Sequence, residues 1–438
     1  MEGADRERTE AGFKVRTPVD EARRVLRDAV VPDGDDAGPR TGIETVEIER
    51  ADGRTLAQSI TAARNVPHYQ RAAMDGYAVR ASDTFGASDR SPEVLRIAEP
   101  AGGDGEEGGD GHTTADRIAP GTAARVHTGS ALPEGADAVV MIEHVAELES
   151  MGELEVEDAV AEGENVAPIG EDVEAGQTLY DPGHRLRPSD LGLLRSAGYA
   201  RVDVAQRPTV GVVPTGEELV ADDPDPGEVI ETNGLTVSRL AERWGARATY
   251  RDVVTDDPES LRVAIQRDLT KDVVVTTGGS SVGERDLIPE VIDDLGEVIV
   301  HGVGLKPGHP VCLGVVEETP VLALPGYPVA CIVNAVQFLR PTLRWLEGTT
   351  PDPHPSVRAE LDRKIASEPG TRTFARVQLE KRDAGGHDPD FAAIPTRASG
   401  SGVLSSVALA DGWVVVDDDR EGIPAGETVT VENWEVNP

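Results

Sequence analysis

A glycine-rich loop that ends in acidic residues is the part of this chain whose residue types point most directly to chemistry. Residues 271–286 have the sequence KDVVVTTGGSSVGERD, in which an apolar stretch leads straight into the loop. Adjacent glycines let backbone N–H groups approach an anion, and two carboxylates could hold a divalent cation against a phosphate. The residues concerned are Gly278, Gly279, Ser280, Gly283, Glu284 and Asp286. We therefore predict a phosphorylated ligand held partly through Mg²⁺, while an ordinary strand-to-helix turn would also explain two adjacent glycines.

Two further loops also follow predicted strands and would lie at the same edge of a sheet as the glycine-rich loop. From residue 208 to 348, short apolar strands alternate with amphipathic helices, which predicts a central doubly wound α/β domain with a mainly parallel sheet. Ligands of such sheets bind at the carboxyl ends of the strands. Residues 215–218 (TGEE) and 325–328 (PGYP) follow predicted strands just as the glycine-rich loop does. Three such loops at one sheet edge favour a binding site more strongly than any one of them alone.

Hydrophobic spacing predicts the elements that would position these loops. We expect strands at 210–213, 273–276, 311–316 and 321–324, and helices around 237–244, 261–265 and 329–348. Nearer the N-terminus we expect a helix with Thr17 as its cap and Pro18 in its first turn. Its apolar face comprises Ala22, Val25, Leu26, Ala29 and Val30. Residues 189–197 predict another capped helix, which ends at Gly198.

The rest of the chain divides by composition into further units. We expect residues 1–16 to be disordered and 17–58 with 164–207 to form an N-terminal linking domain. Residues 59–163 predict an inserted, mixed β-rich domain, in which the polar segment 101–116 is a surface loop. Residues 208–348 form the α/β domain, and 349–438 a small C-terminal β domain that begins with a stiff proline-rich linker.

The composition excludes several classes of protein. With 80 acidic residues against 42 Lys and Arg, the formal net charge is −38, which argues against binding to nucleic acid or anionic membranes. Many dispersed acids and only five lysines predict a halophilic protein whose self-repulsion is screened by salt. No long apolar run or secretion signal is present, and Cys312 and Cys331 lie in apolar stretches. These features predict a cytoplasmic protein with buried, reduced thiols and no zinc site.

Seven sequence blocks, in order along the chain, resemble those of a known family. The blocks are 71–78 (RAAMDGYA), 127–140 (HTGSALPEGADAVV), 170–172 (GED), 214–219 (PTGEEL), 277–284 (TGGSSVGE), 306–308 (KPG) and 324–328 (LPGYP). Together they resemble the MoeA family of molybdopterin molybdenumtransferases, which is related to the C-terminal region of gephyrin. The resemblance covers residues 17–438.

The resemblance implies a reaction and an assembly. Proteins of this family insert molybdate into the dithiolene of adenylylated molybdopterin, with Mg²⁺ involved and AMP released. The implied fold has four domains per subunit in an elongated homodimer. The cleft would lie between the α/β domain of one subunit and the N-terminal domains of the other. The implied partners are the molybdopterin adenylyltransferase and acceptor molybdoenzymes, and gephyrin shows that the scaffold also anchors proteins.

The resemblance further implies roles for three catalytic acids. Asp75 would face the cleft and hold Mg²⁺ or orient a water, Glu218 would contact the substrate, and Asp286 with Glu284 would form the Mg²⁺ and pyrophosphate site. Each acid also has an ordinary explanation. A turn Asp bonds to its own backbone, a Glu at a helix start is solvated, and Glu284 is equally consistent with a surface position.

Other residues are assigned to substrate binding. Thr215 lies in the PTGEEL block, and Thr128 could bind a phosphate or cap a turn. Asp256 matches a further site acid of the family, but Asp257 is an alternative, and a helix cap before Pro258 is a competing explanation.

The remaining substrate-binding assignments lie in two turns. Lys306 offers a compact cation for phosphate or molybdate oxygens, which we favour over a surface salt bridge. Pro325, Gly326 and Pro328 would form a rigid loop with backbone donors facing an oxyanion, and could also simply start a helix.

Three departures from the family pattern lie near the presumed oxyanion site. Tyr327 replaces a common Asn, Gly302 (beside His301) a common basic residue, and His309 a common Lys. They leave open whether molybdate or tungstate is the substrate. Two other hypotheses remain: a non-catalytic molybdopterin-binding or scaffold protein, and a nucleotidyltransferase acting on molybdopterin itself.

Overall fold

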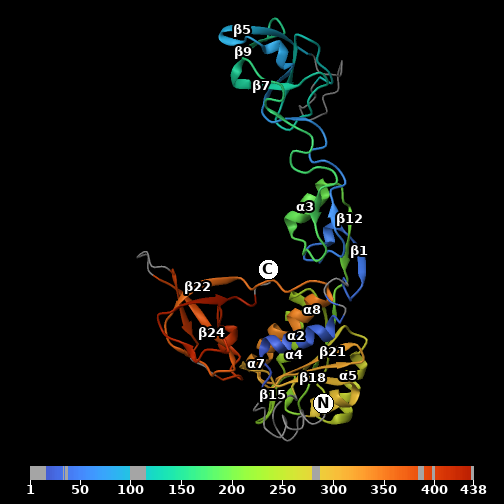
Figure 1. The fold of residues 1–438 in the computed structure, drawn as a ribbon, viewed down its shortest axis with the longest axis vertical. Coiled ribbons are helices and arrows are strands. Elements are labelled where there is room, and N and C mark those ends of the chain that lie inside the picture. Colours follow the sequence, from blue (N-terminus) through green and yellow to red (C-terminus); the bar gives the residue numbers. More distant parts are fainter. Residues whose placement is uncertain are drawn as a thin grey trace.

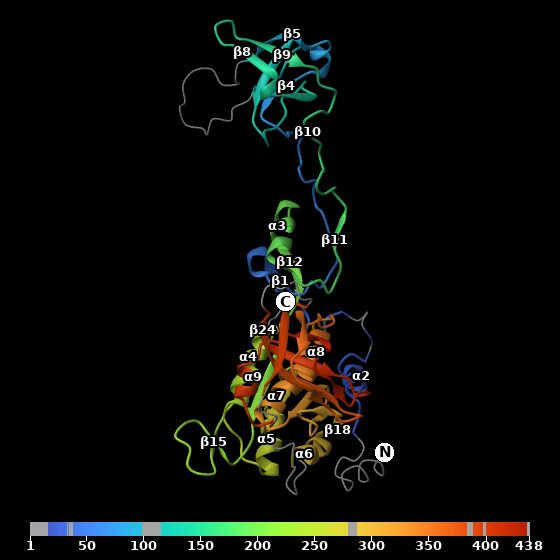
Figure 2. The same ribbon diagram turned by 90° about the vertical axis from the view of Figure 1, so that its left-hand side faces the viewer.

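The computed structural model describes residues 16–32, 34, 38–98, 115–278, 287–382, 389–396 and 400–435. The chain is elongated (Figure 1). The α/β domain and the C-terminal domain lie side by side at one end, a linking domain stands above them, and the inserted β domain is at the far end. The turned view in Figure 2 shows the same separation. The expected segments 1–15 and 101–114 lie outside the described residues.

The α/β domain is built on a six-stranded sheet, in the order β16-β13-β17-β21-β20-β18. Its strands are β13 (Thr209–Pro214), β16 (Arg247–Tyr250), β17 (Val273–Thr277), β18 (Glu297–His301), β20 (Cys312–Val316) and β21 (Thr319–Leu324). The first four strands in that order are mutually parallel, whereas β20 pairs antiparallel with both β21 and β18. The prediction of a mainly parallel sheet is therefore confirmed.

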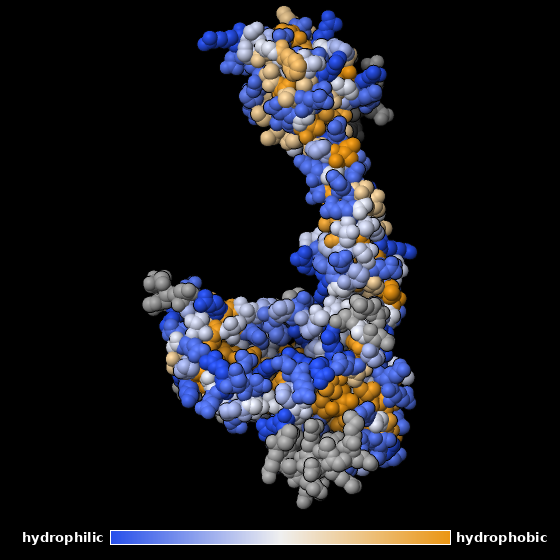
Figure 3. All heavy atoms as spheres, viewed as in Figure 1, coloured by the Kyte–Doolittle hydropathy of each residue, from blue (hydrophilic) through white to orange (hydrophobic). Residues whose placement is uncertain are grey.

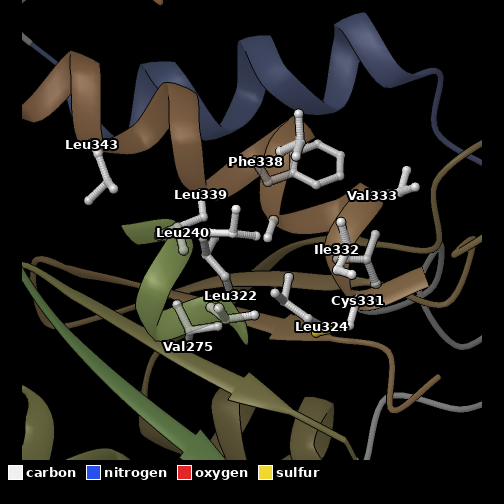
Figure 4. Close-up of a cluster of buried hydrophobic side chains, with 14 of the residues drawn as sticks. Leu240, Val275, Leu322, Leu324, Cys331, Ile332, Val333, Phe338, Leu339 and Leu343 are labelled. Atoms are coloured by element: carbon white, nitrogen blue, oxygen red, sulfur yellow. The ribbon is translucent and has the colours of Figure 1, made fainter. Parts of the chain in front are cut away.

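Helices cover both faces of this sheet. They are α4 (Asn233–Arg243), α5 (Pro258–Asp268), α6 (Leu287–Leu295), α7 (Pro328–Asn334) and α8 (Arg340–Leu346). A π-helical segment, Ala335–Leu339, joins α7 to α8, so the predicted long helix is continuous from residue 328 to 346. The side chains in Figure 4 show α4, β17, β21 and the long helix contributing to one apolar cluster. Cys312 and Cys331 are buried thiols, and neither forms a disulfide within the described residues.

The N-terminal helix α2 (Val19–Val30) belongs to this core. Val19, Ala22, Leu26 and Val30 are buried in the same cluster as the long helix. The sequence placed this helix in the linking domain, whereas in the structure its apolar face packs against α8 and the sheet of the α/β domain. The predicted cap is wrong: Pro18 precedes the first turn, and the Thr17 N–H donates instead to the Gly302 carbonyl.

The linking domain is small. It contains β1 (Ile43–Glu47) paired with β12 (Arg201–Ala205), β2 (Ile60–Thr61) paired with β11 (Thr178–Tyr180), a 3₁₀ turn at Ile48–Arg50, and α3 (Pro188–Ser196). Helix α3 confirms the predicted capped helix. The N–H of Arg187 donates to the carboxylate of Asp190, and Gly198 adopts a φ of 106° just past the helix end.

The inserted domain carries a six-stranded sheet in the order β7-β4-β6-β5-β9-β8. Its strands are β4 (Gly76–Val79), β5 (Ser88–Ile97), β6 (Thr122–Val126), β7 (Ala138–Met141), β8 (Val145–Leu148) and β9 (Glu153–Asp158), with 3₁₀ turns at Ala81–Thr84 and Ile142–His144. β3 (Arg71–Ala72) pairs with β10 (Val166–Ala167) where the chain enters and leaves the domain. Its own core includes Tyr77, Leu154 and Val156.

The C-terminal domain is a β barrel. Its strands are β22 (Ser356–Leu361), β24 (Arg372–Lys381), β25 (Phe391–Pro395), β26 (Gly412–Val416) and β28 (Thr428–Glu432). The pairing of β24 with both β25 and β26 closes the ring. β23 (Ile365–Ala366), β27 (Gly422–Ile423) and the short α9 (Ser405–Ala408) complete it. β19 (Leu305–Lys306) of the α/β domain pairs with β24 and joins the two domains.

Polar residues dominate the face seen in Figure 3, as the acidic composition requires. No helix within the described ranges is long and apolar enough to cross a membrane.

Candidate functional site

The candidate site begins where two neighbouring parallel strands end. β13 lies between β16 and β17, so the chain leaves β13 on one side, forms β16, and crosses back to form β17. The loops after β13 and β17 therefore diverge at the carboxyl edge of the sheet. We call this switch point the crevice, because it is where sheets of this kind bind their ligands. β14 (Leu219–Val220) and β15 (Val229–Ile230) pair within the long connection after β13.

Thr215 and Gly278 meet in this crevice. Gly278 adopts a φ of 149°, and a β-carbon there would lie far inside van der Waals distance of the Thr215 carbonyl oxygen and 2.8 Å from its hydroxyl. Only glycine fits this close approach of two backbones. The sequence-based assignment of both residues to one sheet edge agrees with this geometry.

Buried hydroxyl groups lie at the same edge. Thr215, Thr276 and Thr277 are each no more than 2% exposed. Within the described part of the chain, their hydroxyl oxygens have no hydrogen-bond partner. Buried polar groups usually have partners, so unsatisfied hydroxyls at the end of a parallel sheet are typical of a site that a polar ligand completes.

The loop 325–328 closes the third side of the crevice. The Gly278 N–H donates to the Leu324 carbonyl at 3.0 Å, and a β-carbon on Gly326 would lie 3.6 Å from the Gly278 Cα. Asn233, at the start of α4, donates from Nδ2 to the Gly326 carbonyl at 2.7 Å. Sequence reasoning missed Asn233. Its position at the first residue of a helix, just after a long loop, was the only available signal.

Glu218 turns back over its own loop. Its side chain is exposed, and its carboxylate lies so near Gly216 that a β-carbon there would be 2.8 Å from Oε2. Glu218 therefore lies on the crevice loop, as expected, with a carboxylate accessible to solvent.

Asp257, rather than Asp256, caps α5. The Asp257 carboxylate accepts the Ser260 N–H at 2.9 Å, and hydrogen bonds from Ser260 and Thr255 lower the pKa of Asp257 to about 2. The helix-cap position considered for Asp256 is therefore occupied by Asp257. Val254 forms a bridge with Thr215, which brings this segment beside the crevice.

Asp75 and Thr128 form a pair in the inserted domain. The Thr128 N–H and hydroxyl donate to Asp75 Oδ1 at 2.6 and 2.8 Å. These two bonds lower the pKa of the Asp75 carboxyl, so it is ionised at neutral pH. The pair lies in the domain farthest from the α/β crevice (Figures 1 and 2), so one chain does not bring it to Thr215 and Gly278.

Lys306 lies between the α/β and C-terminal domains. Its Nζ is 3.2 Å from Glu368 Oε1, and both side chains are more than half exposed. In this structure Lys306 therefore forms the surface salt bridge, which the sequence ranked as the weaker alternative. A surface pair of this kind is weak and leaves the ammonium free to exchange partners.

The predicted residues Gly279, Ser280, Gly283, Glu284 and Asp286 lie outside the described residues. Within the described ranges, no cluster of three His, Cys, Asp or Glu side chains could hold a metal ion by itself. Of the departures, Tyr327 is 64% exposed and contacts Gly402 of the C-terminal domain. Burial, and then Arg16, lower the pKa of His309, so it is a neutral group where a Lys would be charged.

The fold defines a class: a multidomain protein with a doubly wound α/β domain whose candidate site lies at the switch point of its sheet. Comparison with known proteins makes this specific. Residues 17–198 match the MoeA N-terminal region (domain I and II), 211–345 a probable molybdopterin binding domain, and 358–434 the MoeA C-terminal region (domain IV). The chain belongs to the MoeA family.

Similar proteins cover nearly the whole chain. A putative molybdopterin biosynthesis protein of Methanocaldococcus jannaschii is 36% identical over 89% of this chain and 92% of its own length. The molybdopterin molybdenumtransferase of Bacillus subtilis is 32% identical, over 89% of both chains. The crystal structure of the molybdopterin biosynthesis MoeA protein from Pyrococcus horikoshii has a TM-score of 0.77 and 33% identity, and covers 96% of this chain and 99% of its own.

Proposed function

We propose that this protein is a molybdopterin molybdenumtransferase in molybdenum cofactor biosynthesis. It would take adenylylated molybdopterin and molybdate or tungstate as substrates, insert the metal oxyanion at the dithiolene, and release AMP. The observation that carries the proposal is the crevice between β13 and β17, in which Gly278 meets Thr215 beside unsatisfied buried hydroxyls. Curated relatives named for this activity cover about nine-tenths of the chain.

The residues of the crevice would mainly bind and orient the substrate. Threonine hydroxyls donate to phosphate oxygens, and the Pro325–Pro328 loop, fixed by Asn233, limits the position of the pterin-bearing group. AMP would leave as a water molecule attacks the pyrophosphate and forms a new P–O bond in place of the one broken, and neutralisation of the phosphate charge would make AMP a better leaving group.

Mg²⁺ would supply that charge neutralisation when bound. Asp75 is a suitable ligand for such an ion, because its carboxylate is ionised, exposed and oriented by two hydrogen bonds. Mg²⁺ usually takes one or two carboxylates together with substrate phosphates, so a dedicated cluster of protein ligands is not required. Glu284 and Asp286 are the second source of carboxylates that we propose.

A homodimer would complete the site. Asp75 and Thr128 are separated from their own α/β crevice by the linking domain (Figure 1). A second copy, arranged so that its inserted domain reaches this crevice, would supply the missing carboxylate. We propose this arrangement because it accounts for two groups of site residues lying far apart in one chain.

Release of AMP from adenylylated molybdopterin tests the function. The purified protein would be incubated in concentrated KCl with Mg²⁺, with and without molybdate or tungstate. Release that depends on one of the two oxyanions is expected and identifies the metal. Tight binding without AMP release under either oxyanion would support a scaffold instead, and consumption of ATP with unmodified molybdopterin would support a nucleotidyltransferase.

A further inference from the structure

A second cleft lies where the C-terminal barrel meets the α/β domain. It has a volume of about 670 Å³ and lies between α2, the helix from the π segment through α8, the linker 351–356, and strands β24, β26 and β28. Three arginines and one histidine line this cleft. Arg372 is paired with Asp20, which leaves Arg23, Arg340 and His354 as its other basic residues. Its size is in the range of small-molecule binding sites.

The two arginines face this cleft with only neutral hydrogen-bond acceptors. Arg23 donates from Nε to the Gln337 carbonyl at 3.1 Å and from Nη2 to the Gln337 side chain. Arg340 is 6% exposed and donates to the Asp352 carbonyl at 2.6 Å. The nearest carboxylate oxygen to Arg23, from Asp20, is 3.9 Å away, and Arg340 has no salt bridge to any residue that the structure describes. The Arg340 guanidinium is therefore buried without an ion pair among the described residues, which is costly, whereas the Arg23 side chain is 34% exposed and pairs only loosely with Asp20.

The sequence explains why regular α-helical hydrogen bonds are missing in the long helix beside this cleft. Pro341 has no N–H, so carbonyls one turn earlier lose their usual helical donor. The chain forms a π segment over Ala335–Leu339, in which the Arg340 N–H reaches back to the Ala335 carbonyl, and Arg23 supplies the donor for Gln337. Short π segments occur frequently at functional sites.

His354 adds a third group to the same cleft. Its Nδ1 atom is buried and has no hydrogen-bond partner among the described residues. Burial, and then the charges of Arg340 and Arg23, lower the pKa of His354 to about 4. The imidazole is therefore neutral at pH 7, and an Nδ1–H tautomer could donate to an anion without adding a charge of its own.

Three of the acids that line the cleft contact other side chains, and the carboxylate of the fourth, Asp352, partly offsets the effect of burial on the pKa of Arg340. Asp20 forms two hydrogen bonds with Arg372 at 2.7 and 2.8 Å, and Asp417 lies 3.9 Å from the same guanidinium. Glu432 accepts the indole N–H of Trp413 at 3.0 Å. Asp352 uses its backbone carbonyl toward Arg340, while its residue as a whole is exposed. Burial, and then Arg344, lower the pKa of Arg340 to about 10, which indicates that its charge is poorly compensated.

We propose that this cleft binds a tetrahedral oxyanion of the phosphate or sulfate class between Arg23, Arg340 and His354. Two guanidiniums offer paired donors that match phosphate geometry, and the histidine offers a third. The anion is either free or the terminal group of a phosphomonoester, for whose organic part the cleft has room. The site is distinct from the reactive crevice: Pro328 and Arg340 are twelve residues apart on one continuous helix, about 18 Å along its axis.

Binding is tested by calorimetry on the full chain in 1 M KCl. Sulfate, inorganic phosphate and glycerol 3-phosphate are titrated separately. Arg23→Gln is expected to weaken the binding of all three at least tenfold, and Arg340→Gln likewise. Arg24→Gln is the matched control, because Arg24 is exposed on the same helix and pairs with Asp28 at 3.1 Å; it should bind as the unaltered protein does. Tighter binding of glycerol 3-phosphate than of phosphate would identify a phosphomonoester, and equal binding a free ion.

Two further measurements locate the anion independently of the variants. A crystal soaked in selenate should show anomalous density between the two guanidiniums and His354 Nδ1. The pKa of His354, followed by NMR and assigned with His354→Gln, should rise when sulfate is added. The proposal is overturned if Arg23→Gln and Arg24→Gln bind sulfate equally well, if selenate is absent from the cleft, or if sulfate leaves the His354 pKa unchanged.

Discussion

Thr128 donates two hydrogen bonds to a single oxygen of Asp75, one from its backbone N–H at 2.6 Å and one from its hydroxyl at 2.8 Å. The pair fixes the carboxylate at an exposed turn and lowers the pKa of Asp75. An exposed acid that gains no packing from this arrangement is better explained by a binding role than by stability. A substitution at Asp75 therefore also tests the proposed dimeric site.

Asp75→Asn should abolish most AMP release without unfolding the protein. The amide keeps the shape of the side chain but removes the charge that would hold Mg²⁺, so we expect at least a tenfold loss of turnover. The assay is AMP release at saturating oxyanion, with the melting temperature measured alongside. Asp89→Asn, at an exposed position of the same domain, is the control and should retain full activity. Normal release by Asp75→Asn would remove Asp75 from the mechanism.

Gly278→Ala should disrupt the crevice. The new β-carbon would meet the Thr215 backbone, and the φ of 149° is unfavourable for alanine. Backbone strain alone would cost about 1–3 kcal/mol, and binding of adenylylated molybdopterin should be lost. Gly152→Ala provides the comparison, because Gly152 has a φ of 65° but open space around its β position. Equal substrate affinity in both variants would show that the close approach is not needed for binding.

Asp190 should give the linking domain a pH-dependent stability. Burial alone would raise its pKa, but hydrogen bonds from Arg187, His184 and Tyr180 outweigh that effect, and the pKa falls below the usual value. A lowered pKa means that the stabilisation is present above the unfolded pKa of about 3.9 and is lost as the pH falls through the folded value. Asp190→Asn should therefore cost roughly 1.5–3 kcal/mol at pH 7.

The difference between this variant and the unaltered protein should shrink below pH 4, because the unfolded chain takes up a proton at Asp190 there while the folded protein still holds it ionised. Thermal unfolding from pH 7 to pH 2.5 measures it, with Asp181→Asn, an exposed acid of the same domain, as the control. A gap that stays constant over the whole range would mean that charge is not the source of the stabilisation.

Concentrated salt should stabilise the whole protein. A net charge of −38 produces self-repulsion that potassium ions screen, and five lysines offer few compensating ammonium groups. We expect the melting temperature to rise steadily from 0.1 M to multimolar KCl. A melting temperature that is independent of KCl would contradict the halophile interpretation.

The α/β domain could be predicted closely because its signals are local. Alternating strands and helices, glycines at the turns and strand-end loops together located Thr215, Gly278 and Gly326 at one sheet edge. The closure of the C-terminal barrel was less accessible, since pairing β24 with β26 depends on contacts between distant segments. Where the position of a residue in the site depends on a second chain or on a bound ligand, the sequence could suggest the residue but could not show which other residues lie beside it.

The differences between prediction and structure have specific physical causes. Thr17 has the side chain of a helix cap, but its backbone is recruited by Gly302, so the cap is not made. Helix α2 is adjacent in sequence to the linking domain, yet its apolar face matches the α/β core. Asn233 has no motif of its own, and its contact with Gly326 depends on tertiary packing that spacing does not reveal.

The position of α2 also bears on how the chain is made. Its four buried residues pack against α8 and strands β18, β20 and β21, which are the last parts of the α/β domain to leave the ribosome. From Val30 to Leu346 the ribosome adds 316 residues, which takes roughly 15–60 s at usual rates of synthesis. During that time an amphipathic helix at the start of the chain waits for its partners. This domain can therefore complete its core only after the helix that ends at Leu346 has been made, and until then the nascent chain is a natural client for chaperones.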